Sequence, residues 1–134
     1  MTIPKNLPLH FKWALAAAKQ GHVRGQSYTA ECYEKGWGVE QNEDSAFEWY
    51  LKAAEQQDVV AQRRVGICFE EGKGCPRHAG KALNWYRAAA RQGDQHAIDA
   101  NARMSQVMIA LLQNLLQNPV QLLQVQEHMI HNNL

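Results

Sequence analysis

The chain repeats itself at a spacing of 36 residues, and this self-similarity limits its possible folds more than any other feature. Comparing Tyr33–Ala61 with Phe69–Ala97 gives 11 identities in 29 positions, clustered at glycines, alanines and aromatics. A period of this length is typical of stacked helix pairs. The recurring residues are Gly36, Gly38, Ala46, Trp49, Tyr50, Ala53, Ala54 and Ala61, which return as Gly72, Gly74, Ala82, Trp85, Tyr86, Ala89, Ala90 and Ala97. Stacked short repeats build an extended surface, so the period favours binding of another macromolecule over catalysis in a deep cleft.

Each repeat predicts a first helix, a Gly-x-Gly turn and a second helix. Glycines suit the turn because they adopt the positive φ values that other residues avoid. In the second helix, Ala46, Trp49 and Ala53 share one face, which we expect to be buried, with the tryptophan filling the space between helix pairs. Trp85 is expected to do the same one repeat later.

These patterns predict an all-α protein, an α/α solenoid of antiparallel helix pairs with a C-terminal helical cap. We expect a single domain over residues 1–134, with two full repeats and flanking partial units in 7–104 and an amphipathic cap or assembly segment in 105–134. The expected helices are about Leu7–Gln20, Gly25–Lys35, Glu43–Gln57, Val59–Glu71 and Ala79–Gln92, with another beginning near Gln95.

Charge and cysteine content limit the kind of partner and the cellular compartment that we expect. Fourteen basic and 13 acidic residues give a formal net charge of +1 without long runs of either sign, which disfavours a nucleic-acid partner. The segment Phe11–Ala18 is a poor export signal and fits the repeat as a helix, so we expect a cytoplasmic protein whose Cys32, Cys68 and Cys75 remain thiols. No stretch reaches the roughly 20 apolar residues of a membrane span.

Two segments, YEKGWGVEQNEDSAFEWYLKAAEQQDVVA and FEEGKGCPRHAGKALNWYRAAARQGDQHA, resemble the Sel-one-like repeat family over about Leu9–Ala97. The resemblance implies a solenoid similar to tetratricopeptide repeats that acts as an adaptor between proteins. Ala54 and Gln62 stand where disulfide-rich relatives carry a cysteine pair, which excludes that branch. Gln57 replaces a glycine usual after the second helix, so we expect a tighter turn or a slightly longer helix there.

By similarity to tetratricopeptide repeats, the first helix of each pair should line a concave groove that binds a protein or peptide. The groove residues expected are Arg24, Ser27, Glu31, Glu34, Lys35, Val60, Arg63, Ile67, Glu70, Glu71, His96, Asp99, Arg103 and Gln106. This groove would have an acidic centre and accept basic and apolar side chains. The alternative is that these residues are ordinary solvated helix faces.

The segment 105–134 carries one formal charge, Glu127, among amides and aliphatic residues. Its apolar spacing predicts an amphipathic helix, then a second helix with Asn118 as N-cap and Pro119 as first residue. These helices would cap the solenoid, join two copies or a partner, or adsorb to a membrane. The residues proposed for assembly are Met108, Leu112, Leu115, Leu122, Leu123 and Met129.

Candidate chemistry is sparse. His128 and His131 have a metal-compatible spacing but no evident third ligand, and Cys68, Cys75 and His78 fit packing and loop roles better than zinc. No nucleophile, phosphate loop or nucleotide motif is present, so we expect no catalytic residue, metal or cofactor. The leading hypothesis is a non-enzymatic adaptor or scaffold. The alternatives are an inhibitor or immunity-type protein that occludes a toxin or enzyme, and a hydrolase.

Overall fold

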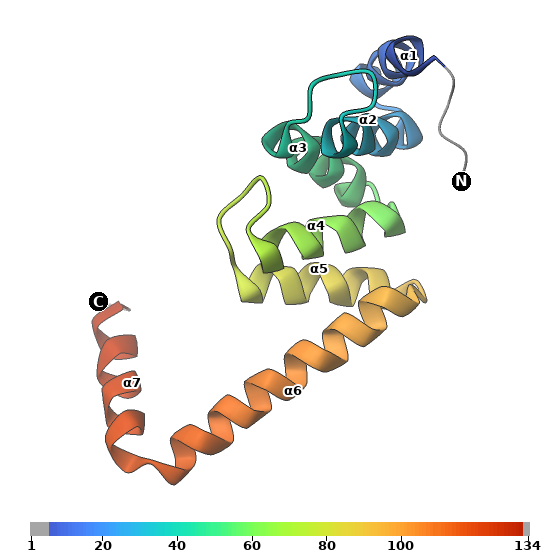
Figure 1. Ribbon diagram of the computed structural model, residues 1–134. Helices are drawn as coiled ribbons and strands as arrows, with labels where there is room; N and C mark the ends of the chain where they lie inside the picture. The colour runs from blue at the N-terminus through green and yellow to red at the C-terminus, as the bar shows by residue number, and fades with distance from the viewer. Residues whose placement is uncertain (1–5, 133–134) are drawn as a thin grey trace. The chain divides into compact units, whose positions relative to one another are not determined.

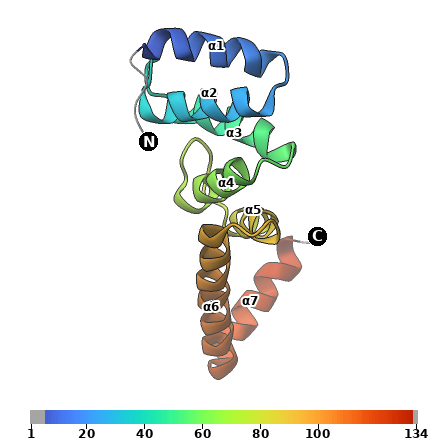
Figure 2. The same cartoon turned by 90° about the vertical axis from the view of Figure 1, so that its right-hand side faces the viewer.

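The computed structural model describes residues 6–132, and in that range the chain forms seven α-helices and no strand. Consecutive helices from α1 to α5 pack against each other as layers of a stack (Figures 1 and 2). The helices are α1 Leu7–Lys19, α2 Val23–Lys35, α3 Glu43–Glu55, α4 Val59–Glu71, α5 Ala79–Arg91, α6 Gln95–Gln117 and α7 Pro119–Asn132. The predicted all-α solenoid of helix pairs is confirmed.

Contacts divide the chain into two compact units, Met1–Asn101 and Ala102–Leu134. The first unit holds α1 to α5 and the start of α6. The second holds the rest of α6 and α7, which diverge from a turn at Asn118 (Figure 1). The sequence analysis expects a boundary at residue 104, and the contacts divide the chain after Asn101. Both positions lie inside the continuous helix α6.

Several helices begin where the sequence supplies a side chain that can bind the free N–H groups of the first turn. Asn42 Oδ1 accepts a hydrogen bond from Ser45 N at 3.0 Å, and Asp58 Oδ2 accepts one from Ala61 N at 2.8 Å. In the second unit, Asn118 Oδ1 accepts one from Gln121 N at 3.4 Å and α7 starts at Pro119, as predicted.

The Gly-x-Gly turns end the first helix of each pair. Gly36 and Gly72 cap α2 and α4 in the left-handed conformation, at φ 72° and 75°. Gly74 also has a positive φ, and any side chain there would collide with the backbone of Glu43. Here glycine is required by both conformation and space.

The buried face of the second helices differs from the sequence expectation. Tyr50 and Tyr86 are buried to 3% and 2% exposure, whereas Trp49 and Trp85 are only partly buried against the core. The expectation of a buried face is therefore confirmed for Ala46 and Ala53, at 4% and 0% exposure, whereas the tryptophans pack against the core without being fully buried. Each tryptophan lies one residue before its tyrosine, about 100° around the helix, and the tyrosine ring points more directly inward. At Trp49, Lys52 Nζ covers the ring, 4.6 Å from its centroid.

The turn at Gln57 also corrects an expectation. Gln57 has φ 72°, like its glycine counterparts Gly21 and Gly93 at 91° and 89°. α3 has 13 residues, as do α1 and α5, so the turn is neither tighter nor the helix longer. Glutamine is held in the left-handed conformation, at a cost of about 1–2 kcal/mol.

Buried glutamines connect consecutive helices, a feature that the sequence analysis missed. Gln62 of α4, 1% exposed, donates from Nε2 to Ala54 O of α3 at 3.3 Å and accepts from Gln92 Nε2, beyond α5, at 2.8 Å. Gln26 makes the same bonds one repeat earlier, with Ala18 O at 3.3 Å and Gln56 Nε2 at 2.6 Å. The 36-residue spacing of these glutamines is the sequence signal for this glutamine ladder.

Candidate binding clefts on α2 and α4

Two adjoining clefts lie between α2, α3 and α4, and they share Tyr50 and Arg64. The larger, about 450 Å³, is here called the arginine cleft; the smaller, about 130 Å³, the glutamate cleft. The arginine cleft is lined by Arg24, Ser27, Tyr28, Glu31, Tyr50, Asp58, Val60, Arg63 and Arg64. The glutamate cleft is lined by Glu34, Gln41, Glu43, Ala46, Tyr50, Arg64, Ile67, Cys68 and Lys73.

The structure brings together seven residues that the sequence places in the groove. Five of them line the arginine cleft, namely Arg24, Ser27, Glu31, Val60 and Arg63, and two line the glutamate cleft, Glu34 and Ile67. Helical spacing explains the arrangement, because Arg24, Ser27 and Glu31 follow i, i+3 and i+7 on α2.

Other expected groove residues line neither cleft. Glu70 Oε1 accepts a hydrogen bond from Tyr86 OH at 2.7 Å, and Asp99 Oδ1 accepts one from Gln95 Nε2 at 2.9 Å. Glu71 forms an ion pair with Lys73 at 3.1 Å. Arg103 belongs to the second unit.

Arg64 and Tyr28 were missed although helical spacing points to them. Val60, Arg63, Arg64 and Ile67 lie at i, i+3, i+4 and i+7, so Arg64 belongs to the stripe that contains its neighbours. Tyr28 holds the equivalent place on α2. Arg64 adds a positive charge to both clefts, where the sequence suggested an acidic centre of the groove.

The carboxylates of the arginine cleft are already engaged. Asp58 Oδ2 caps α4 and accepts a hydrogen bond from Ser27 Oγ at 3.0 Å, and Glu31 Oε1 lies 3.0 Å from Lys35 Nζ. Arg63, also in the cleft, has its own ion-pair partner outside it, because Arg63 Nε lies 3.2 Å from Asp94 Oδ2. Both carboxylates of the cleft therefore already have a partner within the chain.

Donor groups in the same cleft are not engaged. Over the described residues 6–132, Arg24 is exposed and has no ion-pair partner, and the hydroxyl of Tyr28 has no hydrogen-bond partner. Burial, with Cys32 and Glu31 nearby, raises the pKa of Tyr28, so its hydroxyl keeps its proton and can donate. The arginine cleft thus has an exposed, unpaired guanidinium and, beneath its surface, a buried hydroxyl without a partner, and both groups can donate to a carboxylate.

In the glutamate cleft, charges balance. Glu34 Oε1 lies 3.8 Å from Arg64 Nη1 and 3.5 Å from Tyr50 OH. Burial, and secondarily Glu34, raises the pKa of Tyr50 far above its ordinary value, so this tyrosine stays neutral. The charged groups of this cleft therefore pair with each other, and the cleft is less suited to a charged ligand.

The cysteines are poor nucleophiles. Cys32 and Cys68 are buried, and burial raises their pKa values to about 11 and about 12. Cys75 is the most accessible of the three thiols. No group of three or more metal-ligating side chains occurs among residues 6–132, and no described helix is both long and apolar enough to cross a membrane.

A stack of helix pairs with shallow clefts on its first helices defines the class of helical-repeat solenoids. The Sel1 repeat model matches residues 2–22, 23–58 and 59–94, and the chain belongs to the Sel1 repeat family. Proteins of this family generally act as scaffolds for protein interactions, and their fold is typically non-catalytic. No curated protein matches the sequence.

Solved structures support the assignment. A Sel1 repeat protein from Oxalobacter formigenes is 39% identical over 73% of this chain and 40% of that one, with a TM-score of 0.71. The protein c5321, a protective antigen present in uropathogenic Escherichia coli strains, is 31% identical over 75% of this chain and 21% of that one, with a TM-score of 0.73. This chain therefore spans less than half the length of both proteins.

Helicobacter pylori cysteine rich protein B shares the fold, with a TM-score of 0.64 and 23% identity over 67% of this chain and 68% of that one. At this identity the likeness concerns the fold alone. The three cysteines of the present chain are all free thiols.

Proposed function

We propose that the chain is a non-enzymatic, cytoplasmic scaffold that binds a segment of a partner protein in the arginine cleft. The segment carries an acidic side chain, whose carboxylate pairs with Arg24 and accepts a hydrogen bond from Tyr28. The observation that carries the proposal is the unpaired Arg24 beside carboxylates that already have partners. This replaces the basic ligand that the sequence alone suggested.

The size of the arginine cleft supports a peptide ligand. About 450 Å³ lies within the range of ligand sites and has room for a few side chains. Val60 is 43% exposed at its edge and offers an apolar contact next to the polar groups. A segment with one acidic and one apolar side chain would use both features.

Peptide binding tests the charge preference directly. Fluorescence anisotropy would compare labelled peptides of alternating leucine and glutamate with equal-length peptides of leucine and lysine. We expect the acidic peptide to bind more tightly, and Arg24→Glu to weaken its binding about tenfold or more, because a charge-assisted hydrogen bond is lost and a repulsion is introduced.

Lys12→Glu is the matched control, since it makes the same charge change on exposed α1, away from both clefts. Equal binding of the two peptides, or equal effects of the two variants, would refute the proposed site.

A partner captured by the wild type and by Lys12→Glu, but lost with Arg24→Glu, would be the physiological ligand. Its own activity then separates two functions of the same surface. A partner that stays active when bound fits an adaptor. A toxin or enzyme that loses activity fits the inhibitor or immunity-type alternative.

A further inference from the structure

The helices of the second unit lack charge where ordinary surface helices carry it. From residue 105 to residue 134 the only charged side chain is Glu127, and the polar positions are filled mostly by glutamine and asparagine. Exposed helix faces in soluble proteins usually carry lysine and glutamate. This pair of helices therefore does not have the composition of a solvated surface.

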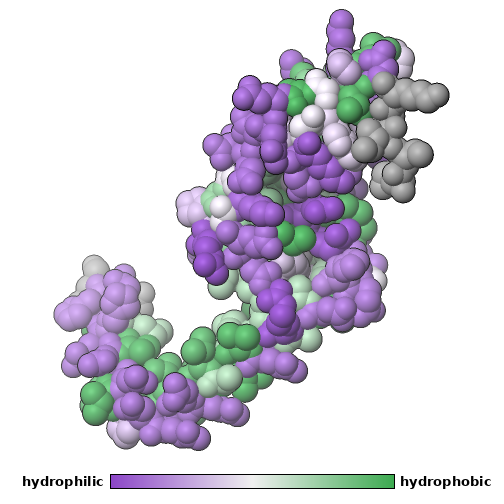
Figure 3. Space-filling view, viewed as in Figure 1, coloured by the Kyte–Doolittle hydropathy of each residue, from purple (hydrophilic) through white to green (hydrophobic). Residues whose placement is uncertain are grey.

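The apolar faces of α6 and α7 are nonetheless exposed. On α6, Met108, Leu112 and Leu116 lie at i, i+4 and i+8 and are 50%, 58% and 69% exposed. On α7, Leu123 and Met129 are exposed to a similar degree. Figure 3 shows hydrophobic side chains gathered over these two helices. Within the second unit, neither helix covers these side chains of the other.

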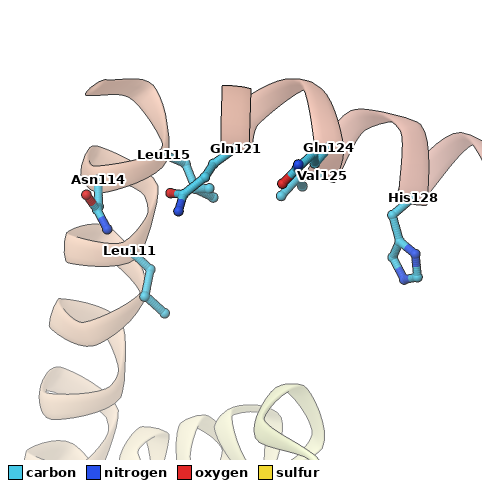
Figure 4. Close-up of a pocket in the computed structure, with 7 residues that line it drawn as sticks. All are labelled: Leu111, Asn114, Leu115, Gln121, Gln124, Val125 and His128. Carbon is cyan, nitrogen blue, oxygen red and sulfur yellow. The ribbon is translucent and has the colours of Figure 1, made fainter. Parts of the chain in front are cut away.

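The divergence of α6 and α7 leaves a groove of about 520 Å³ between them. Leu111 and Leu115 of α6 lie on one side, and Gln121, Val125 and His128 of α7 face it from the other (Figure 4). Apart from the imidazole of His128, the groove has apolar and amide walls, and it contains no lysine, arginine or carboxylate. It has room for several large aliphatic side chains from outside the hairpin.

We propose that the groove is filled by a second copy of the chain, and that two α6–α7 hairpins join about a twofold axis. Each hairpin would insert apolar side chains of its exposed faces into the groove of the other. In a twofold interface the same patch lies on both partners, so every charge near the axis meets its own copy. An almost uncharged patch avoids this repulsion, and amides pair with amides because each is both donor and acceptor.

The area is sufficient for a stable dimer. Eleven large apolar side chains of the second unit are at least 37% exposed, and a stable interface buries about 800 Å² on each partner, which side chains of this size and number can supply. These are Val107, Met108, Ile109, Leu111, Leu112, Leu116, Val120, Leu123, Val125, Met129 and Ile130. A membrane surface fits less well, because residues 105–134 contain no lysine or arginine to attract anionic lipid.

Sedimentation equilibrium of the full chain tests the proposal. We expect a dimer for the wild type and a monomer for Leu112→Glu, with the dissociation constant raised at least about a hundredfold by like charges facing each other. Leu112 is exposed in the single chain, so circular dichroism should show unchanged helicity. Leu9→Glu, on exposed α1, is the control and should remain dimeric.

A charge-swap experiment excludes simple misfolding. In the proposed dimer Leu112 of each copy lies next to Leu112 of the other at the twofold axis, so Leu112→Glu and Leu112→Lys should each be monomeric alone and form a mixed dimer when combined. A wild type that remains monomeric at about 100 μM, a dimeric Leu112→Glu, or the absence of the mixed dimer would each overturn the proposal. The experiment does not depend on the arginine cleft, so peptide binding and dimerisation can fail separately.

Discussion

At the scale of single residues, a few close approaches decide whether the helices can stack. Gly66 of α4 faces the ring of Tyr86 of α5, and a Cβ atom added there would lie 2.7 Å from Tyr86 Cδ1. Because both residues are buried, neither can move without disturbing the core. Glycine is retained inside this helix for space, against its poor helix propensity.

We therefore expect Gly66→Ala to lower the free energy of unfolding by about 1–3 kcal/mol, as overpacked core positions do. Gly80→Ala is the matched control. Gly80 is exposed in the first turn of α5, and its added Cβ would meet only the side chain of His78. This variant should be neutral or stabilising by up to about 1 kcal/mol. Urea denaturation measures both; destabilisation of equal size would contradict the steric explanation.

Sequence periodicity alone reveals such residues incompletely. The 36-residue repeat identifies Tyr86 as structural, but Gly66 has an alanine as its counterpart at residue 30, so the contact is not a repeated one. Helical spacing also shows which residues share a face of the helix, but not how deeply each side chain is buried. For this reason Trp49 was expected at the buried position that Tyr50 occupies. The unpaired state of Arg24 depends on where Glu31 and Asp58 find their partners, and only three-dimensional contacts supply that information.

At the scale of helices, the glutamine ladder connects each first helix with the end of the helix before it and the end of the helix after it. Gln62 lies at 1% exposure, so removing its amide leaves both a cavity and lost hydrogen bonds. Without Gln62, the amide of Gln92 would still have one partner, because its Nε2 also donates to Gln57 O at 3.2 Å.

We expect Gln62→Ala to destabilise the solenoid by about 2–3 kcal/mol, combining about 1 kcal/mol per hydrogen bond with the cavity. Gln106→Ala, at an exposed position of α6, should change stability by less than about 0.5 kcal/mol. Thermal or urea unfolding would show the difference. Indistinguishable midpoints for the two variants would mean that the ladder does not contribute.

Helix positions were predictable because the signals are local. The glycines that end α2 and α4 and the caps that begin α3 and α7 can be read from a few adjacent residues. By contrast, the left-handed Gln57 is imposed by the stack, against local preference. The roles of α6 and α7 could not be read from the repeat at all, because the period ends before them.

At the scale of the whole molecule, the two proposals together describe a bivalent scaffold. A dimer would carry two arginine clefts, so a surface crowded with acidic segments could be bound at two points at once. This would raise the overall affinity without any new contact within a cleft.

We expect the wild type to dissociate from a densely immobilised leucine–glutamate peptide at least about tenfold more slowly than Leu112→Glu. At sparse immobilisation, where a second site is out of reach, the two proteins should dissociate at the same rate. Surface plasmon resonance measures both. Equal rates on the dense surface would show that the two clefts do not act together.

The glutamine ladder also bears on how such a chain can change in length. The hydrogen bonds of Gln26 and of Gln62 join groups that recur every 36 residues. An inserted copy of one 36-residue unit would therefore carry its own buried glutamine, and this glutamine would have hydrogen-bond partners in the units before and after it. No buried amide would be stranded by the insertion. At Ile98, where the next rung would begin, the amide is replaced by an aliphatic side chain that is 40% exposed. A duplicated unit can therefore be accommodated inside the stack. After Ile98, which has no side-chain amide, the ladder offers no partner to a further unit.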